Sequence, residues 1–482
     1  MTEISSNIKA GVLYTALSKY STIVTNIFIS AVLARILTPA EFGVVAISTV
    51  FISFFNLLSN FGISPAIIQN KSLTEKDISS IFSFSILFGL FLSFLFFLAA
   101  PFIASFYNEP ALNNICRLLS LSILFNSLQV VPSALMLKKL QFKVNGIISF
   151  SASIISGIVA IILAYLGFSY YALVINSLLT AIITFSTYYY MSPIHISFSL
   201  SFSSIKKISK FSIFQFMFNV INYFSRNLDN LLIGKFFSPS DLGYYDKSYR
   251  LMKMPLQNLT FVITPVLHPI LTNYQNEKQI IFNTYFKIVK FLAIIGFPLS
   301  IFFFFTASEI VFIIYGPQWG QSIPVFKLLA LSVGIQMVLS STGSIFQATN
   351  RTELMFYSGF ISTIFTVSGI IYGVFIGNSL ISVGYGVIIA FGINFFQGLF
   401  LLIKIALGQS YLQFLKVFLF PITLSISIGI ALWLLTFIEI NNIFLSVVIK
   451  LILSLFVAGI VFVFSKENLE FTTKFIGKIF KK

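Results

Sequence analysis

Residues 79–107 read SSIFSFSILFGLFLSFLFFLAAPFIASFY and contain no charged side chain. A helix of this length exceeds the thickness of a bilayer's hydrocarbon core, which is roughly 30 Å. In water it would need apolar cover on every side, and the rest of the chain offers mainly more runs of the same kind. Of the 482 residues, 57% are hydrophobic and 9% are charged, and the mean hydropathy is +0.96. The sequence therefore predicts an all-α polytopic membrane protein surrounded by lipid.

Short breaks with charges or with Pro, Gly and Asn separate the apolar runs, so we predict about fourteen transmembrane helices. The first run, 10–37, is too long for a signal peptide and is interpreted as the first span. The spans are expected at 10–37, 42–68, 79–107, 111–136, 144–166, 169–190, 211–237, 242–272, 280–308, 319–348, 353–376, 381–406, 411–438 and 442–465.

The longest polar break, 191–210, is rich in Ser and Lys and marks the boundary between two predicted lobes. Residues 1–200 are expected to form an N-terminal six-helix lobe and residues 201–406 a C-terminal six-helix lobe. Two additional transmembrane helices follow in 407–465, and 466–482 form a basic cytoplasmic tail.

An internal repeat supports the two lobes. Residues 33–43 read LARILTPAEFG and residues 233–243 read IGKFFSPSDLG, so that a base, a hydroxyl-Pro pair, an acid and a Gly recur in the same order. Because six predicted spans separate the copies, both have the same orientation, as in a parallel transporter repeat. Arg35 and Lys235 fall at the C-terminal ends of their predicted helices, where a cation is favoured by the helix dipole.

The net charge is +16, but the bases are spread over short loops and the tail rather than gathered on a soluble face, which argues against nucleic-acid binding. Alternate predicted loops carry lysines and acids in turn. By the positive-inside rule, this distribution predicts that both termini lie in the cytoplasm.

The few cysteine and histidine residues predict neither a disulfide nor a metal site. Cys116 is the single cysteine, and His195 and His268 lie far apart in the sequence. No metal and no other cofactor is expected, because nothing in the sequence resembles a zinc or catalytic constellation.

Charged residues inside predicted spans are the main functional signal, because they are costly in lipid and usually face a cavity or each other. Arg226 and Asp229 lie three residues apart in the seventh predicted span and could pair. The eighth span adds Asp246, Lys247, Arg250 and Lys253 at or beside one helix face.

Two further bases, Lys19 and Arg117, fall in the first and fourth predicted spans, and Glu109 could approach Arg117. Acids are too few to neutralise all these bases, so an anionic guest such as a diphosphate or an acidic sugar is expected. The predicted cationic substrate-binding set is Lys19, Arg117, Arg226, Lys247, Arg250 and Lys253.

Several stretches in order resemble the polysaccharide transporter family of the MOP superfamily, which includes Wzx-like O-antigen, capsule and teichuronic acid flippases. The most specific are RNLDNLLIGKFFSPSDLGYYDKSYRLM at 226–252 and ALMLKKLQFK at 134–143, with LARILTPAEFGVVA at 33–46 in support. The resemblance runs along nearly the whole chain.

This resemblance implies a V-shaped, alternating-access protein of the bacterial cytoplasmic (inner) membrane. The implied substrate is an oligosaccharide repeat unit linked to undecaprenyl diphosphate, flipped to the outer leaflet for the biosynthesis of O-antigen (lipopolysaccharide), capsule or teichuronic acid. The resemblance also implies coupling to a proton or sodium gradient, and Asp229 is the candidate residue because it is the only acid deep in a predicted span.

Three alternatives stay open at this point. A multidrug exporter of the MATE type would be expected to carry acids for cationic drugs, whereas bases dominate here. A lipid II flippase shares a cationic cavity and is harder to separate by sequence. A membrane polysaccharide polymerase or glycosyltransferase would need acid or base groups in a sizeable outer loop, and the predicted outer loops are short. We therefore predict that the chain is not an enzyme.

Overall fold

The computed structural model describes residues 2–60, 63–69, 73–139, 141–192, 194, 223–224, 226–260, 271, 274–275 and 277–480. Within these ranges every element of secondary structure is a helix. The chain forms two compact units, Met1–Gly243 and Tyr244–Lys482, each described here by itself. Most of the predicted lobe boundary at 191–210 lies outside the described residues, as do His195 and His268, so that boundary stays a prediction.

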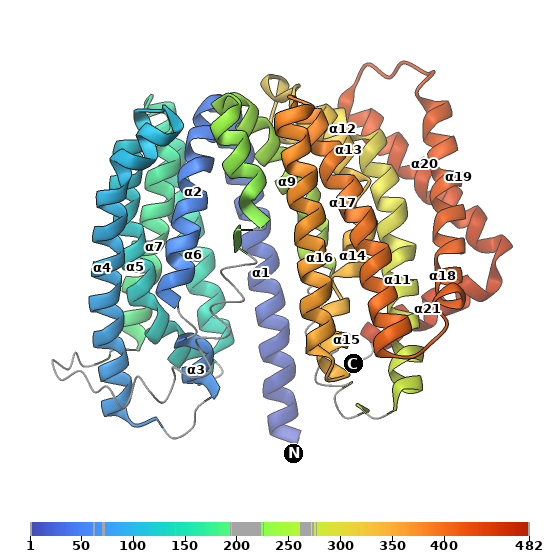
Figure 1. The fold of residues 1–482 in the computed structure, drawn as a ribbon, viewed down its shortest axis with the longest axis horizontal. Coiled ribbons are helices and arrows are strands. Elements are labelled where there is room, and N and C mark those ends of the chain that lie inside the picture. The colour runs from blue at the N-terminus through green and yellow to red at the C-terminus, as the bar shows by residue number, and fades with distance from the viewer. Residues whose placement is uncertain are drawn as a thin grey trace. The chain divides into compact units, whose positions relative to one another are not determined.

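The first unit, from blue to green in Figure 1, is a bundle of long helices. α4 packs along α5, α1 along α6, and α7 against both α5 and α6. The helices are α1 (Thr2–Ile36), α2 (Pro39–Asn60), α3 (Ile63–Gln69), α4 (Glu75–Tyr107), α5 (Ala111–Lys138), α6 (Phe142–Tyr165), α7 (Tyr171–Met191), helical residues 226–236, and the first turn of α9 (Pro239–Leu259), which continues into the second unit.

The second unit contains more broken helices. Its elements are α11 (Lys278–Phe305), α12 (Ala307–Ile314), η2 (Pro317–Trp319), α13 (Ser322–Ala330), α14 (Val333–Leu339), α15 (Thr342–Ala348), α16 (Thr352–Ile371), η3 (Tyr372–Ile376), α17 (Leu380–Phe400), η4 (Leu401–Ala406), α18 (Tyr411–Leu415), η5 (Lys416–Phe418), α19 (Leu419–Leu435), α20 (Ile443–Phe464) and α21 (Lys466–Phe480). α11 is central and packs against α13, α14 and α19, while α16 packs along α17.

Among the described residues, 10 helices are long and apolar enough to cross a membrane, or 11 if α13 and the following α14–α15 segment form one span bent by 46°. The ten match predicted spans, and the bent pair matches the run predicted at 319–348. The other three predicted spans are 10–37, which α1 covers up to Ile36, and 211–237 and 242–272, which lie partly outside the described residues. The total of fourteen and the V-shaped arrangement therefore stay predictions.

Local sequence signals set the ends of these helices. Thr74 and Asp77 form a capping box at the start of α4, in which each side chain accepts a hydrogen bond from the other residue's backbone N–H. Asn108 ends the helix in the left-handed conformation, with φ of 54°. The short turn to α5 makes the two helices antiparallel neighbours.

Small polar residues fill the interface between α4 and α5. Ser93 donates a hydrogen bond to the carbonyl oxygen of Ser120 at 2.7 Å, and Ser127 donates to that of Ser85 at 3.0 Å. Gly89 faces Ser127 so closely that an added Cβ would lie 2.6 Å from its Cβ. Small residues that allow close helix approach, with hydroxyls bonded across the interface, are typical of packing in lipid.

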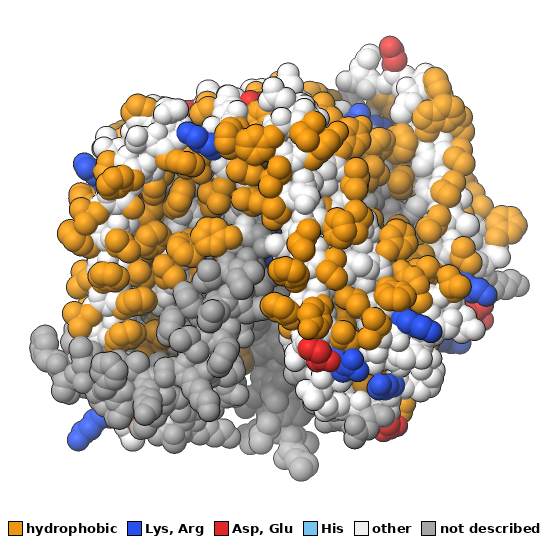
Figure 2. Space-filling model, viewed as in Figure 1, with side chains coloured by type: hydrophobic (Ala, Val, Ile, Leu, Met, Phe, Trp, Pro, Cys, Tyr) orange, Lys and Arg blue, Asp and Glu red, His pale blue; other side chains and the backbone are white. Residues whose placement is uncertain are grey.

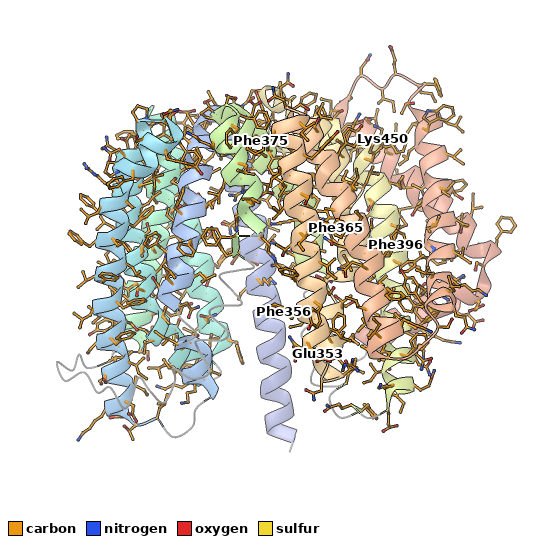
Figure 3. All side chains as sticks on the ribbon, viewed as in Figure 1. Glu353, Phe356, Phe365, Phe375, Phe396 and Lys450 are labelled. Atoms are coloured by element: carbon orange, nitrogen blue, oxygen red, sulfur yellow. The ribbon has the colours of Figure 1, made fainter. Side chains whose placement is uncertain are left out.

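The outer surfaces have the opposite character. Large apolar side chains are exposed along the spans, among them Phe102 at 77% and Ile376 at 72%. Figure 2 shows apolar side chains over most of the visible face, while charged ones gather near its edges. In Figure 3, Phe356, Phe365 and Phe375 follow one another along the α16–η3 helix. These surfaces fit lipid and confirm the prediction of an integral membrane protein.

The two copies of the sequence repeat fold alike. Thr38 with Glu41, and Ser238 with Asp241, form the same side chain-to-backbone box before α2 and α9, each of which begins at a proline.

The copies also pack against each other reciprocally. A Cβ added to Gly43 would lie 1.7 Å from the carbonyl oxygen of Pro239, and one added to Gly243 would lie 2.1 Å from that of Pro39. We call this reciprocal contact the repeat clasp.

Candidate functional site

The second unit presents its charge cluster on α9, and hydrogen bonds hold this helix to the start of α13. Ser248 donates to the carbonyl oxygen of Ser322 at 2.9 Å, and Ser322 donates to that of Tyr244 at 3.1 Å. The rings of Tyr244 and Trp319 meet edge to face, with centroids 6.0 Å apart. These contacts hold α9 in place, and with it the side chains of Lys247, Arg250 and Lys253.

Lys247 lies inside this interface. The residue is only 2% exposed, and its ammonium group lies 4.9 Å from the ring centroid of Tyr315 and 5.8 Å from that of Trp319. Aromatic faces attract a cation most strongly where water is excluded. Lys247 therefore lies beneath the α9 surface with its amine against two aromatic rings.

Arg250 and Lys253 occupy more open positions on the same helix. The Nε of Arg250 donates to the Oδ2 of Asp246 one turn earlier, at 2.7 Å, yet the Arg250 side chain remains 58% exposed. The ammonium of Lys253 lies 4.2 Å from the ring centroid of Tyr249. Asp246 is the one acid beside Lys247, Arg250 and Lys253, so bases outnumber acids along this part of α9.

In the first unit, Arg226 and Asp229 differ in burial although they are three residues apart. Arg226 is exposed, whereas Asp229 is 5% exposed and accepts a hydrogen bond from the backbone N–H of Asn230 at 2.8 Å. The same helical segment is tied to α2, because the hydroxyl of Tyr223 donates to the carbonyl oxygen of Val50.

The other predicted bases of the first unit lie on separate helices. Lys19 is half-buried on α1. Arg117 is exposed on α5, and its guanidinium lies 5.0 Å from the ring centroid of Phe97 on α4. Glu109, expected near Arg117, contributes to a cavity of about 330 Å³ at the α4–α5 turn, lined by Pro101, Ala104, Ser105, Asn108, Glu109, Pro110 and Asn113.

The structure thus brings Lys247, Arg250 and Lys253 together on one helix, and places Lys19, Arg117, Arg226 and Asp229 in the other unit. Whether all six bases serve one substrate stays a prediction. In the described part of the chain, no group of three or more His, Cys, Asp or Glu residues could hold a metal ion.

One buried ion pair was missed by the sequence analysis, because the predicted span 280–308 ends just before Glu309. Glu309 lies in α12 and pairs with Lys450 of α20, and both side chains are almost buried. Lys450 also donates to the carbonyl oxygen of Phe305 at 2.8 Å, and Ser446 donates to Glu309 at 2.8 Å. A lone lysine in the last apolar run was the available signal.

A chain of amide side chains between α2 and α5 was also missed. The Nδ2 of Asn126 donates to the Oδ1 of Asn56 at 3.3 Å, and the Nε2 of Gln129 donates to the Oδ1 of Asn126 at 2.8 Å. Amides in otherwise apolar runs were the signal. Such groups join helices in lipid and can also hydrogen-bond sugar hydroxyls.

Comparison with known proteins agrees with this architecture. The family model described as "Polysaccharide biosynthesis protein" matches residues 32–324. The lipopolysaccharide biosynthesis protein WzxC of Escherichia coli (strain K12) is 27% identical over 428 residues, covering 85% of both chains. The teichuronic acid biosynthesis protein TuaB of Bacillus subtilis (strain 168) is 24% identical over 439 residues, covering 90% of both.

Among solved structures, the lipid II flippase MurJ in an inward closed conformation has a similar fold. The TM-score is 0.76 and the sequence identity 16%, and the similarity covers 95% of this chain and 100% of that one.

Proposed function

Because the chain belongs to the polysaccharide biosynthesis protein family and crosses the membrane many times, we propose that it is a flippase for undecaprenyl-diphosphate-linked oligosaccharide repeat units. It carries them from the cytoplasmic to the outer leaflet of the bacterial inner membrane, for the synthesis of a surface polysaccharide. The names of WzxC and TuaB, which refer to lipopolysaccharide and teichuronic acid, support a substrate of this class.

The observation that carries the proposal is the positive excess on α9. Lys247, Arg250 and Lys253 lie within two helical turns, and Asp246 is their acidic neighbour. A helix of this kind is costly in lipid unless its charged face meets water or an anion. A diphosphate head group supplies that anion, whereas a cationic drug would be repelled.

In this proposal, the more exposed bases of α9 contact the substrate and the buried one does not. Arg250 is exposed and presents a planar fork suited to phosphate oxygens, and Lys253 adds a second donor nearby. Lys247 is buried beneath them, so in this proposal it acts on the anion through its electrostatic field and not by direct contact. In the first unit, Arg226, Lys19 and Arg117 would meet the same polyanion, and the Asn56–Asn126–Gln129 chain would serve sugar hydroxyls.

Ion coupling is assigned to Asp229 in this proposal. It is an acid buried in a membrane-embedded segment beside polar side chains, where binding a proton or sodium ion would change the local charge by one unit. The lipid carrier and the coupling ion are the partners required. Both termini lie in the cytoplasm in this proposal.

The test is transport by Arg250→Ala and Arg250→Lys in reconstituted vesicles, measured as lipid-linked oligosaccharide that appears in the outer leaflet. Removal of a charge-assisted contact should lower the rate about 10- to 100-fold. Arg250→Lys keeps the charge but loses the fork, so it should retain part of the activity.

Arg351→Ala is the matched control, because Arg351 also pairs with a nearby acid, Glu353, at 2.5 Å, but at the start of α16. It should transport normally. Asp246→Ala tests whether Arg250 contacts the substrate or only pairs with Asp246. If the pair is only structural, Arg250→Ala and Asp246→Ala should lower transport equally, and the double variant should recover. Full transport by Arg250→Ala would refute the assignment.

A further inference from the structure

The helix α21 follows the last span directly but is not part of the packed core. It begins at Lys466, after the single residue Ser465 that ends α20, and Figure 1 shows it changing direction there instead of continuing α20. None of the α21 side chains that the structure describes is buried. An isolated helix of 15 residues is only marginally stable in water, so α21 needs a surface to lie on.

The described contacts between α21 and α11 run through Lys290. Glu467 lies 3.7 Å from the ammonium of Lys290, but the Glu467 side chain is 91% exposed. The same ammonium lies 4.8 Å from the ring centroid of Phe471. An ion pair this exposed contributes little. These contacts orient α21 near α11, and the described side chains of Leu469, Phe471 and Thr472 remain exposed or half-buried there.

The sequence of α21, KENLEFTTKFIGKIF, is strongly amphipathic. Apolar residues recur at helical spacing, and the remaining positions hold lysines and glutamates together with Asn, Thr and Gly. Lysines stand at 466, 474, 478, 481 and 482 and acids at 467 and 470, so bases exceed acids. Lys474 is exposed and pairs with Glu470 at 2.9 Å.

We propose that α21 lies on the membrane surface and binds the head groups of anionic phospholipids. An amphipathic basic helix places its apolar side among acyl chains and its lysines beside phosphates. The occupant is the lipid leaflet because the preceding span ends one residue before α21 begins, which puts this helix at the membrane–water boundary. The surplus of lysine makes an anionic leaflet the complementary one.

The experiment uses the full-length chain in lipid nanodiscs. Cys116→Ala removes the native thiol, and Thr472→Cys, on the apolar side of α21, carries a nitrobenzoxadiazole dye that dithionite reduces only from water. In discs containing phosphatidylglycerol the dye should be protected, and in discs of phosphatidylcholine alone it should be reduced faster. Lys474→Gln should raise the reduction rate in anionic discs about five-fold, and 1 M salt should act in the same direction.

Lys404→Gln is the control, because it removes an exposed lysine from η4 and should leave the rate unchanged. Equal protection in neutral and anionic discs, insensitive to Lys474→Gln, would overturn the proposal and show that α21 is held by protein. The readout needs no transport substrate, so it stands or fails independently of the flippase assignment.

Discussion

Gly43 and Gly243 illustrate how much depends on single residues at the repeat clasp. Each glycine receives a backbone carbonyl oxygen of the other copy at a distance that no side chain would allow. The acid, proline and hydroxyl residues of the repeat cap helices locally. The glycines instead join the two copies to each other.

We predict that Gly43→Ala and Gly243→Ala each destabilise the protein. The new Cβ would overlap a backbone oxygen, and relief requires the two segments to move apart, at a cost of about 1 to 3 kcal/mol. The melting temperature in detergent should fall. Gly392→Ala is the matched control, since nothing lies within 4 Å of a Cβ there, and its melting temperature should not fall. Unchanged melting in both clasp variants would mean that the contact is absent in solution.

At the same scale, Asp229→Asn tests ion coupling. The substitution retains the size of this buried side chain but removes its charge, so transport should become independent of the pH or sodium gradient while substrate binding persists. Transport and membrane yield are measured together. Loss of folded protein, with no change in gradient dependence of what remains, would assign Asp229 a structural role instead.

At the scale of elements, α20 buries polar side chains against the rest of its unit. Its buried residues are Ser446, Lys450 and Ser454, which recur every four positions, whereas its apolar residues largely face outward. In lipid, apolar contacts with neighbours give little advantage over acyl chains, so a polar stripe specifies which face packs inward. In Figure 3, Lys450 lies toward the upper end of the second unit, whereas Glu353 lies toward its lower end.

Lys450→Met should strand the Glu309 carboxylate and destabilise the protein by about 3 to 5 kcal/mol. The double variant Lys450→Met with Glu309→Gln should recover much of this loss, because no uncompensated charge remains. Thermal unfolding in detergent measures both. Lys474→Met is the control, since its pair with Glu470 is exposed and should leave melting unchanged. Equal melting of Lys450→Met and the parent protein would contradict the role of this pair.

Sequence patterns predict straight elements better than broken ones. The uninterrupted runs behind α4, α6, α17 and α20 were located to within a few residues, because twenty apolar residues in lipid have few alternatives to a helix. The predicted span at 42–68 divides into α2 and α3, and the run at 319–348 into shorter helices. In lipid, such breaks are tolerated where the protein around them satisfies the freed backbone groups, and sequence patterns do not show those partners.

At the scale of the whole molecule, topology is the principal prediction. In a Cys116→Ala background, a cysteine at Ser240 should react with an impermeant thiol reagent only from outside, and one at Thr473 only from the cytoplasm. The reason is the alternation of lysine-rich and acidic loops, with α21 following the final span. Labelling of both positions from the same side would contradict the predicted orientation of the C-terminal half.

The sequence by itself determined that this chain is a polytopic membrane protein of the polysaccharide family with bases inside its spans, because hydropathy and charge are properties of composition and order. Only the tertiary structure decided how those charges are used. It placed Lys247 under aromatic rings, left Arg250 exposed beside Asp246, and joined Glu309 to Lys450. The physical reason is that the cost of a charge in lipid depends on its partners, and those come from helices distant in sequence.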